Sequence, residues 1–85
     1  MMKYRIGCLC VEAIDAYVRV TVSNMGGVDA PDQVVVSRRK CPSAQDVAQM
    51  VSDLRGYWPD QASLIACGRA ASDARDNKTI CIVNL

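Results

Sequence analysis

One stretch of the chain, residues 41–56, constrains the fold more than any other. Ser43 is a residue type that caps helix N-termini, and Asp46 stands three positions later, where the acid of a capping box is found. Apolar residues then recur at i, i+3, i+4 and i+7, which is the spacing of one helical face. They are Val47, Met50, Val51 and Leu54. Gly56 can adopt the left-handed conformation that ends a helix, so the sequence predicts an amphipathic helix over residues 43–56. A helix this short needs a surface to pack on.

The size and charge of the chain limit its class. It has 85 residues, of which 51% are apolar, and this predicts a single small domain over residues 1–85 with a folded core. Ten basic and nine acidic residues leave a net charge of +1. Such a balance gives no overall field that attracts nucleic acid or anionic lipid, and it is not acidic enough to mimic DNA. Any function that depends on charge must therefore come from a local cluster.

The sequence carries no signal for a membrane or for export. No segment reaches the roughly 18 consecutive apolar residues of a membrane-spanning helix. The first residues include basic side chains but lack the apolar run of about 7–15 residues of a signal peptide. We therefore expect a cytoplasmic protein with no membrane partner.

Five cysteines form an odd set without a repeated spacing: Cys8, Cys10, Cys41, Cys67 and Cys81. Secreted disulfide frameworks more often have an even count. The chain has no histidine, so a zinc site would need thiolates from several separate elements. We expect the cysteines to be small buried apolar residues in a reducing compartment, with no metal and no cofactor.

Three stretches before the helix have the pattern of strands. Residues 3–12 form the first, with 13–15 as a hairpin connection, and residues 33–38 form the third after a Gly- and Pro-rich loop over 24–32. Residues 17–23 form the clearest strand, because valine alternates there with polar residues. We expect its valine face to meet the helix and its other face, which includes Arg19, to meet solvent or a partner.

The sequence after the helix fits more than one type of secondary structure. Residues 63–67 fit a buried strand or the first half of a second helix, and periodicity does not decide between them. Gly68 weakens the helical row, which favours the strand, with a small polar connection over 69–77 and a final strand over 79–85. The sequence thus predicts an α+β fold, in which one main helix covers an antiparallel sheet of four to five strands. The order is β-β-β-α-β-β, or β-β-β-α-α-β if 63–67 is helical.

No residue pattern in the sequence marks a catalytic site. There is no histidine to activate a nucleophile, no phosphate-binding P-loop and no dinucleotide-binding glycine pattern. We therefore expect a protein that is not an enzyme. The single tryptophan, Trp58, is expected to fill the phenylalanine-free core, and the neighbouring Tyr57 is the better candidate for a surface contact.

Basic and aromatic residues beside the predicted helix are the candidate binding residues. The densest charge cluster, Arg38, Arg39 and Lys40, precedes the helix and suits phosphate or an acidic protein surface. The alternative is a solvated strand end that discourages aggregation. Arg55 and Tyr57 follow the helix. Together with Arg19, the candidate partner-binding residues are Arg19, Arg38, Arg39, Lys40, Arg55 and Tyr57.

The layout of the chain resembles that of small phage-encoded inhibitors, the anti-CRISPR proteins among them. The features that carry the resemblance are the alternating strand over 18–22, the helix over 43–54 and the closing strand over 79–85. The resemblance implies a protein that blocks a bacterial CRISPR-Cas complex by occupying a protein surface, with a Cas effector subunit as its partner in the host cytoplasm. The alternatives are a small nucleic-acid-binding module that uses Arg19, Arg38, Arg39 and Lys40, and a self-associating homodimer.

Overall fold

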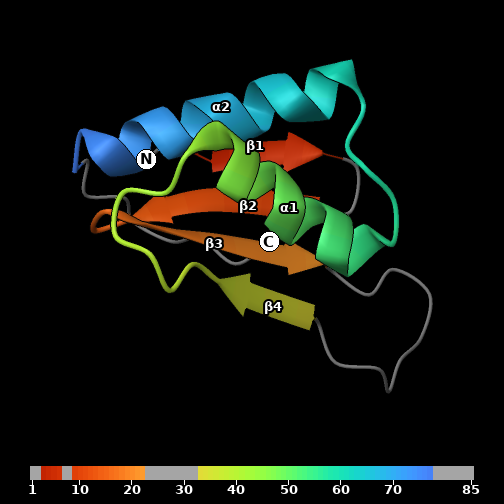
Figure 1. The fold of residues 1–85 in the computed structure, drawn as a ribbon, viewed down its shortest axis with the longest axis horizontal. Coiled ribbons are helices and arrows are strands. Elements are labelled where there is room, and N and C mark those ends of the chain that lie inside the picture. Colours follow the sequence, from red (N-terminus) through yellow and green to blue (C-terminus); the bar gives the residue numbers. More distant parts are fainter. Residues whose placement is uncertain (1–2, 7–8, 23–32, 78–85) are drawn as a thin grey trace.

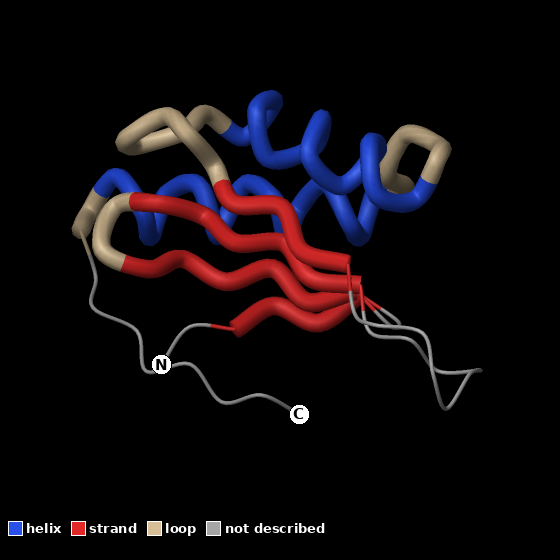
Figure 2. Tube along the Cα trace, turned by 90° about the horizontal axis from the view of Figure 1, so that it is seen from below, coloured by secondary structure: helices blue, strands red, loops and turns tan. Residues whose placement is uncertain are grey.

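A four-stranded antiparallel sheet with both helices on one face makes up the fold in a computed structural model (Figure 1; Figure 2). The structure describes residues 3–6, 9–22 and 33–77, and the statements that follow concern these residues. The elements are β1 (Lys3–Ile6), β2 (Leu9–Ile14), β3 (Tyr17–Val22), β4 (Gln33–Val36), α1 (Ala44–Arg55) and α2 (Gln61–Arg75). The strands lie side by side in chain order, so β1 and β4 are the edges of the described sheet.

The first helix, α1, begins and ends where its sequence predicts. The Ser43 hydroxyl accepts a hydrogen bond of 3.1 Å from the Asp46 backbone N–H, and the Asp46 carboxylate accepts one of 2.9 Å from the Ser43 N–H. At the other end Gly56 has a φ of +83°, the left-handed conformation of a helix C-cap. Local signals are sufficient to define this helix because they agree at both ends.

The second helix, α2, confirms the helical alternative for residues 63–67 and replaces both the preferred strand and the connection expected over 69–77. Asp60 caps it, because its carboxylate accepts a 2.8 Å hydrogen bond from the Ser63 N–H. Small residues recur along its buried side at a helical spacing: Ser63, Cys67, Ala70, Ala71 and Ala74. Gly68 does not break the helix. A Cβ at that position would lie 4.0 Å from the Ala44 Cβ, so the glycine lies beside the start of α1.

The predicted first strand over 3–12 is in fact two strands. β1 and β2 pair antiparallel, with Lys3 opposite Glu12 and Ile6 opposite Leu9. β2 also continues into the predicted connection at 13–15, as far as Ile14, which pairs with Tyr17. The turn between β2 and β3 is the pair Asp15 and Ala16, both with positive φ, as a two-residue hairpin turn of type I′ requires.

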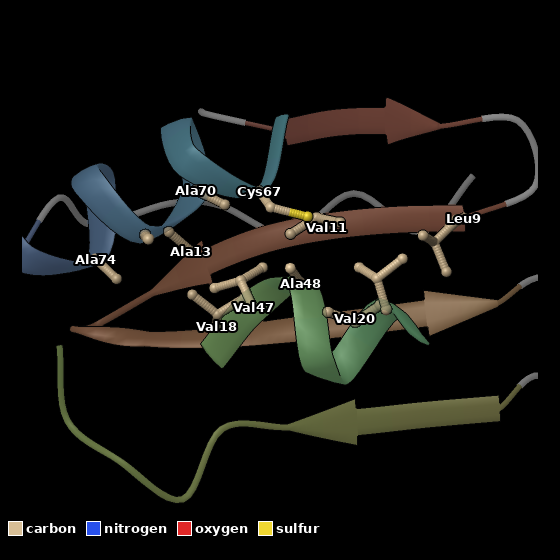
Figure 3. Close-up of a cluster of buried hydrophobic side chains, with 12 residues drawn as sticks. Leu9, Val11, Ala13, Val18, Val20, Val47, Ala48, Cys67, Ala70 and Ala74 are labelled. Carbon is tan, nitrogen blue, oxygen red and sulfur yellow. The ribbon is translucent and has the colours of Figure 1, made fainter. Parts of the chain in front are cut away.

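The core lies between the sheet and the two helices, and it is built from valine, leucine, alanine and cysteine (Figure 3). Val18 and Val20 face the helices, as the alternation in β3 predicts, and Val47 and Val51 meet them from α1. Met50 and Leu54 pack at the margin of this cluster. The buried set is Leu9, Val11, Ala13, Val18, Val20, Val47, Ala48, Val51, Cys67, Ala70, Ala71 and Ala74.

Comparison with the predicted fold confirms the α+β class and the antiparallel sheet. The expectation of one main helix is wrong, because α2 is longer than α1. The described elements run β-β-β-β-α-α, an order that neither predicted alternative contains. The predicted loop over 24–32 and the predicted final strand over 79–85 lie outside the described residues. Within the described part of the chain, neither helix is long and apolar enough to cross a membrane.

Candidate protein-binding surface

The segment that joins α1 to α2 exposes the largest side chains of the described surface. We call residues 55–58 the aromatic turn. Tyr57 is 57% exposed and Trp58 is 49% exposed, so the prediction that Trp58 fills the core is wrong. The Arg55 guanidinium carbon lies 5.0 Å from the centre of the Tyr57 ring, a cation–π contact that favours this arrangement of the two side chains.

The aromatic turn is fixed on both sides. Gly56 ends α1 and redirects the chain, and its N–H donates to the Ser52 carbonyl at 2.7 Å. On the other side Pro59 is buried and Asp60 caps α2. The Ser63 N–H holds the pKa of the Asp60 carboxyl below its usual value, and the charge of Arg55 adds a smaller effect in the same direction. The aromatic side chains are therefore presented by a well-anchored backbone.

Exposed apolar side chains also occur at the beginning of α2. Leu64 is 36% exposed and Ile65 is 51% exposed, and both lie within two turns of the Asp60 cap. Four of the seven exposed large apolar residues of the described chain, Tyr57, Trp58, Leu64 and Ile65, thus come from one stretch of nine residues, 57–65. Such local concentration is typical of interaction surfaces rather than of scattered surface residues.

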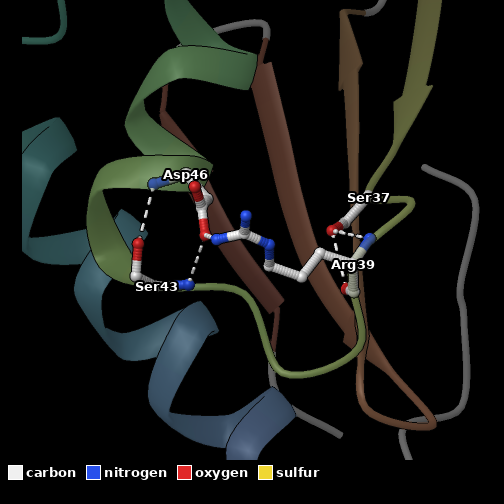
Figure 4. Close-up of polar contacts among 4 residues, drawn as sticks. All are labelled: Ser37, Arg39, Ser43 and Asp46. Atoms are coloured by element: carbon white, nitrogen blue, oxygen red, sulfur yellow. Dashed lines mark hydrogen bonds and ion pairs between the residues drawn. The ribbon is translucent and has the colours of Figure 1, made fainter.

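The predicted basic cluster, residues 38–40, forms an exposed loop between β4 and α1, which we call the basic loop. The Ser37 hydroxyl fixes its start by donating to the Arg39 carbonyl at 2.9 Å and accepting from the Arg39 N–H at 3.2 Å (Figure 4). Its end is fixed by the Cys41 N–H, which donates to the Ala16 carbonyl at 2.8 Å. The loop is thus held against the β2–β3 turn.

The three cations of the basic loop are not equivalent. The Arg39 guanidinium lies 3.2 Å from the Asp46 carboxylate in an exposed ion pair, beside the capping box of α1 (Figure 4). Hydrogen bonds from Ser43 are the main cause of the lowered pKa of the Asp46 carboxyl, and Arg39 contributes less. Among the described residues, Arg38 and Lys40 have no carboxylate within ion-pair distance. Those two cations are the ones available to a partner.

Helix α1 separates the basic loop from the aromatic turn. Its twelve residues span about 18 Å at about 1.5 Å per residue. The exposed side of the helix between the two ends carries Gln45, Gln49 and Asp53, and Gln49 donates to Asp53 at 2.8 Å. The sequence-predicted residues therefore fall into two groups at opposite ends of one helix.

Arg19 lies apart from both groups, on the sheet face that turns away from the helices. Its guanidinium contacts the carboxylate of Glu12 at 3.3 Å, across the β2–β3 pair. The Glu12 residue is only 2% exposed, so Arg19 serves to balance a buried charge. The expected open cation on a solvated strand face is not what the structure contains.

Two further features of the described residues lie outside this surface. An open groove of about 390 Å³ on the outer sheet face is lined by Ile14, Asp15, Tyr17, Val18, Arg19 and Val36. Cys10 and Cys67 are buried as expected, whereas Cys41 is exposed, because the basic loop leaves it at the surface. No group of three or more metal-ligating side chains occurs in the described ranges.

The described residues form a small α+β protein with exposed aromatic side chains at one end of α1 and an exposed basic loop at the other. Comparisons of the chain with protein-family models, with curated proteins and with solved structures found no match. The sequence reasoning identified Arg55 and Tyr57 but missed Trp58, Leu64 and Ile65. The Pro59–Asp60 pair, a cap signal for a helix at 61, would have placed Leu64 and Ile65 on that helix.

Proposed function

We propose that this protein is a non-enzymatic, protein-binding inhibitor that grips its partner with the aromatic turn. The observation that carries the proposal is the exposure of Tyr57 and Trp58 on a backbone anchored by two helix caps. Tyrosine, tryptophan and arginine are the residue types that dominate binding energy at protein interfaces, and the aromatic turn contains all three. Burial of exposed aromatic surface of this kind against a partner lowers the free energy of the complex.

Pre-ordering of the aromatic turn supports a role in binding. A side chain that is mobile before binding loses about 0.5–1.5 kcal/mol when an interface immobilises it. The contact between Arg55 and the Tyr57 ring, 5.0 Å from its centre, restricts both side chains in the free protein. A partner that covers the Tyr57 ring therefore causes a smaller loss of side-chain entropy on binding.

The exposed side of α1 extends the proposed interface toward the basic loop. A specific interface of ordinary size buries roughly 800 Å² on each partner, which is wide enough to include both ends of a helix about 18 Å long. We place Arg38 and Lys40 at the rim, where charges guide the approach of a partner more than they add affinity. The partner surface that suits this arrangement is apolar at its centre and acidic at one margin.

The resemblance to small phage-encoded inhibitors supplies the proposed target. We propose that the protein acts in the cytoplasm of a bacterial host and blocks a CRISPR-Cas complex by binding a Cas effector subunit. The near-neutral net charge favours occlusion of a protein surface over imitation of DNA.

A titration of DNA cleavage by purified Cas effector complexes of several types tests this proposal. An inhibitor that acts by binding should abolish the cleavage by one effector type at about one copy per complex, and Tyr57→Ala with Trp58→Ala should remove the inhibition. Inhibition far below one copy per complex would contradict the proposal, because it would require turnover. Full cleavage by every effector type would refute the CRISPR-Cas target.

The nucleic-acid alternative makes a separate prediction that the same preparations can check. Phosphate contacts release counterions, so binding to DNA or RNA would weaken steeply as salt rises. Of the four cations considered for this role, Arg19 and Arg39 have carboxylate partners, which leaves Arg38 and Lys40. We expect no gel shift of DNA or RNA at low salt.

A further inference from the structure

The outer edge of β4 has its backbone groups directed away from the sheet. The Ser37 N–H donates to the Val18 carbonyl at 2.8 Å, so these two residues form a hydrogen-bonded pair of the β3–β4 ladder. Hydrogen-bonded and non-hydrogen-bonded pairs alternate along an antiparallel ladder. Val35, opposite Val20, is therefore also hydrogen-bonded to β3, while the N–H and C=O groups of Val34 and Val36 point outward. No described strand lies beyond β4.

The side chains of this edge are apolar and exposed. Val34 is 52% exposed and Val36 is 53% exposed, both on the sheet face that turns away from the helices. Residues 33–37 contain no charged residue and no proline. Natural edge strands commonly carry lysine, proline or a bulge that prevents pairing with another strand. Within residues 33–37 β4 has none of the charge or proline devices, and no strand of the described ranges covers its outer edge, so in this part of the structure the edge can accept a further strand.

We propose that β4 pairs antiparallel with β4 of a second copy of this chain, about a two-fold axis beside Val35. In this register Val34 lies opposite Val36 of the partner subunit, and Val36 lies opposite Val34 of the partner subunit. The outward backbone groups of both chains then form two hydrogen-bonded pairs, and Val35 meets the partner's Val35 in the non-hydrogen-bonded position between them. The sheets of the two copies become one continuous sheet.

The edge is complementary to a copy of itself, because the outward groups of Val34 match those of Val36 about Val35, and its charge does not oppose a second copy. In a two-fold interface each residue lies opposite its own equivalent or opposite one particular residue of the same segment in the other chain. Charged residues at the centre of such an interface would therefore lie close to charged residues of the same segment in the other chain. Here residues 33–37 are uncharged, and a second copy approaches without like-charge repulsion. The exposed valines of the two chains then cover one another as a single apolar strip.

The size of the contact sets the strength that we expect. One strand of four residues on each side buries less than the roughly 1,000 Å² of a stable interface. The dimer is therefore weak and forms only at high protein concentration. The proposed contact uses β4 and none of the residues of the aromatic turn, so this inference does not rest on the proposed function.

A pair of charge variants tests both the dimer and its register. Val34→Lys with Val36→Lys sets lysine against lysine in both cross-chain pairs, and we expect a monomer at every concentration. Val34→Lys with Val36→Glu sets each lysine against a glutamate of the other chain, and we expect self-association to persist. Both positions are half exposed, so both variants should keep the fold, which circular dichroism checks.

Sedimentation velocity of the full chain is the measurement, from about 10 μM to about 1 mM, a range that brackets a weak contact of this size. The wild-type chain should shift from monomer to dimer across the range, and the lysine–glutamate variant should do the same. A wild-type chain that stays monomeric throughout would overturn the proposal. The same sedimentation behaviour in both charge variants would overturn the register.

Discussion

Gly56 and Gly68 meet different steric conditions, so the same substitution should have opposite effects at the two positions. Gly56 has a φ of +83°, where a Cβ is strained even though no atom lies within 4 Å of it. Gly56→Ala should lower the free energy of unfolding by about 1–2 kcal/mol. Gly68 lies inside α2 with room for a methyl group, so Gly68→Ala should raise it by about 0.5–1 kcal/mol. Urea unfolding of both variants checks this pair, and equal changes would contradict it.

Ionisation of the Tyr4 hydroxyl should make the free energy of unfolding depend on pH in the alkaline range. Its hydroxyl donates to the carboxylate of the buried Asp73 on α2, and burial followed by this contact raises the pKa of Tyr4 from 10.0 to about 12. The folded state therefore favours the neutral phenol. The stabilisation is complete below a pH of about 10 and is lost as the pH rises toward about 12.

The variant Tyr4→Phe isolates this effect, because it removes the titrating hydroxyl and keeps the ring. The difference in unfolding free energy between wild type and variant should shrink as the pH rises from about 10 to about 12. Other groups that titrate in this range contribute equally to both proteins and cancel in the difference. A difference that stays constant over the range would show that the hydroxyl titrates alike in the folded and unfolded chains.

At the scale of elements, the pair of Glu12 and Arg19 joins β2 to β3 on the outer sheet face. Arg19→Gln removes one charged partner of a carboxylate that is only 2% exposed, and we expect a loss of about 1–3 kcal/mol, since the arginine itself is partly solvated. Glu12→Gln in the same chain should restore part of that loss. A double-mutant cycle by urea unfolding measures the coupling, and additive effects would contradict it.

The contrast between the two helices shows what the sequence can and cannot predict. α1 is predictable because its cap, its apolar spacing and its terminal glycine are local signals that agree. α2 buries mainly alanine, serine and cysteine and exposes the larger apolar residues Leu64 and Ile65, so its apolar periodicity is weak. Its buried side is small because α2 packs close to α1, and the sequence alone does not contain that information.

The sequence predicts the strands and the candidate binding surface only in part, for a similar reason. β1 and β2 appear as one strand because the apolar pattern continues across Gly7, although glycine is a common turn residue. Arg55 and Tyr57 can be selected from residue type and position after the helix. The exposure of Trp58 depends instead on how the two helices pack in three dimensions, which residue type does not predict.

At the scale of the whole molecule, α1 holds two surfaces that should contribute differently to binding. Neutralising Arg38 and Lys40 with alanine should slow association and weaken its salt dependence, with an affinity change of less than about tenfold, because rim charges act mainly on encounter. Arg39 is left intact because its loss would also disturb the α1 cap. Stopped-flow association at two salt concentrations checks this, and a large rise in the dissociation rate would instead place the basic loop at the centre of the interface.

The claim that the aromatic turn grips the partner can be tested directly through Trp58, the single tryptophan of the chain. Labelling this chain alone with 5-fluorotryptophan gives one fluorine NMR signal that does not overlap with signals from the partner. On addition of the partner, the signal should shift and lose its sensitivity to solvent exchange between H₂O and D₂O, because the half-exposed ring becomes covered. A signal that keeps its position and its solvent sensitivity, while sedimentation shows the complex to be formed, would contradict the account.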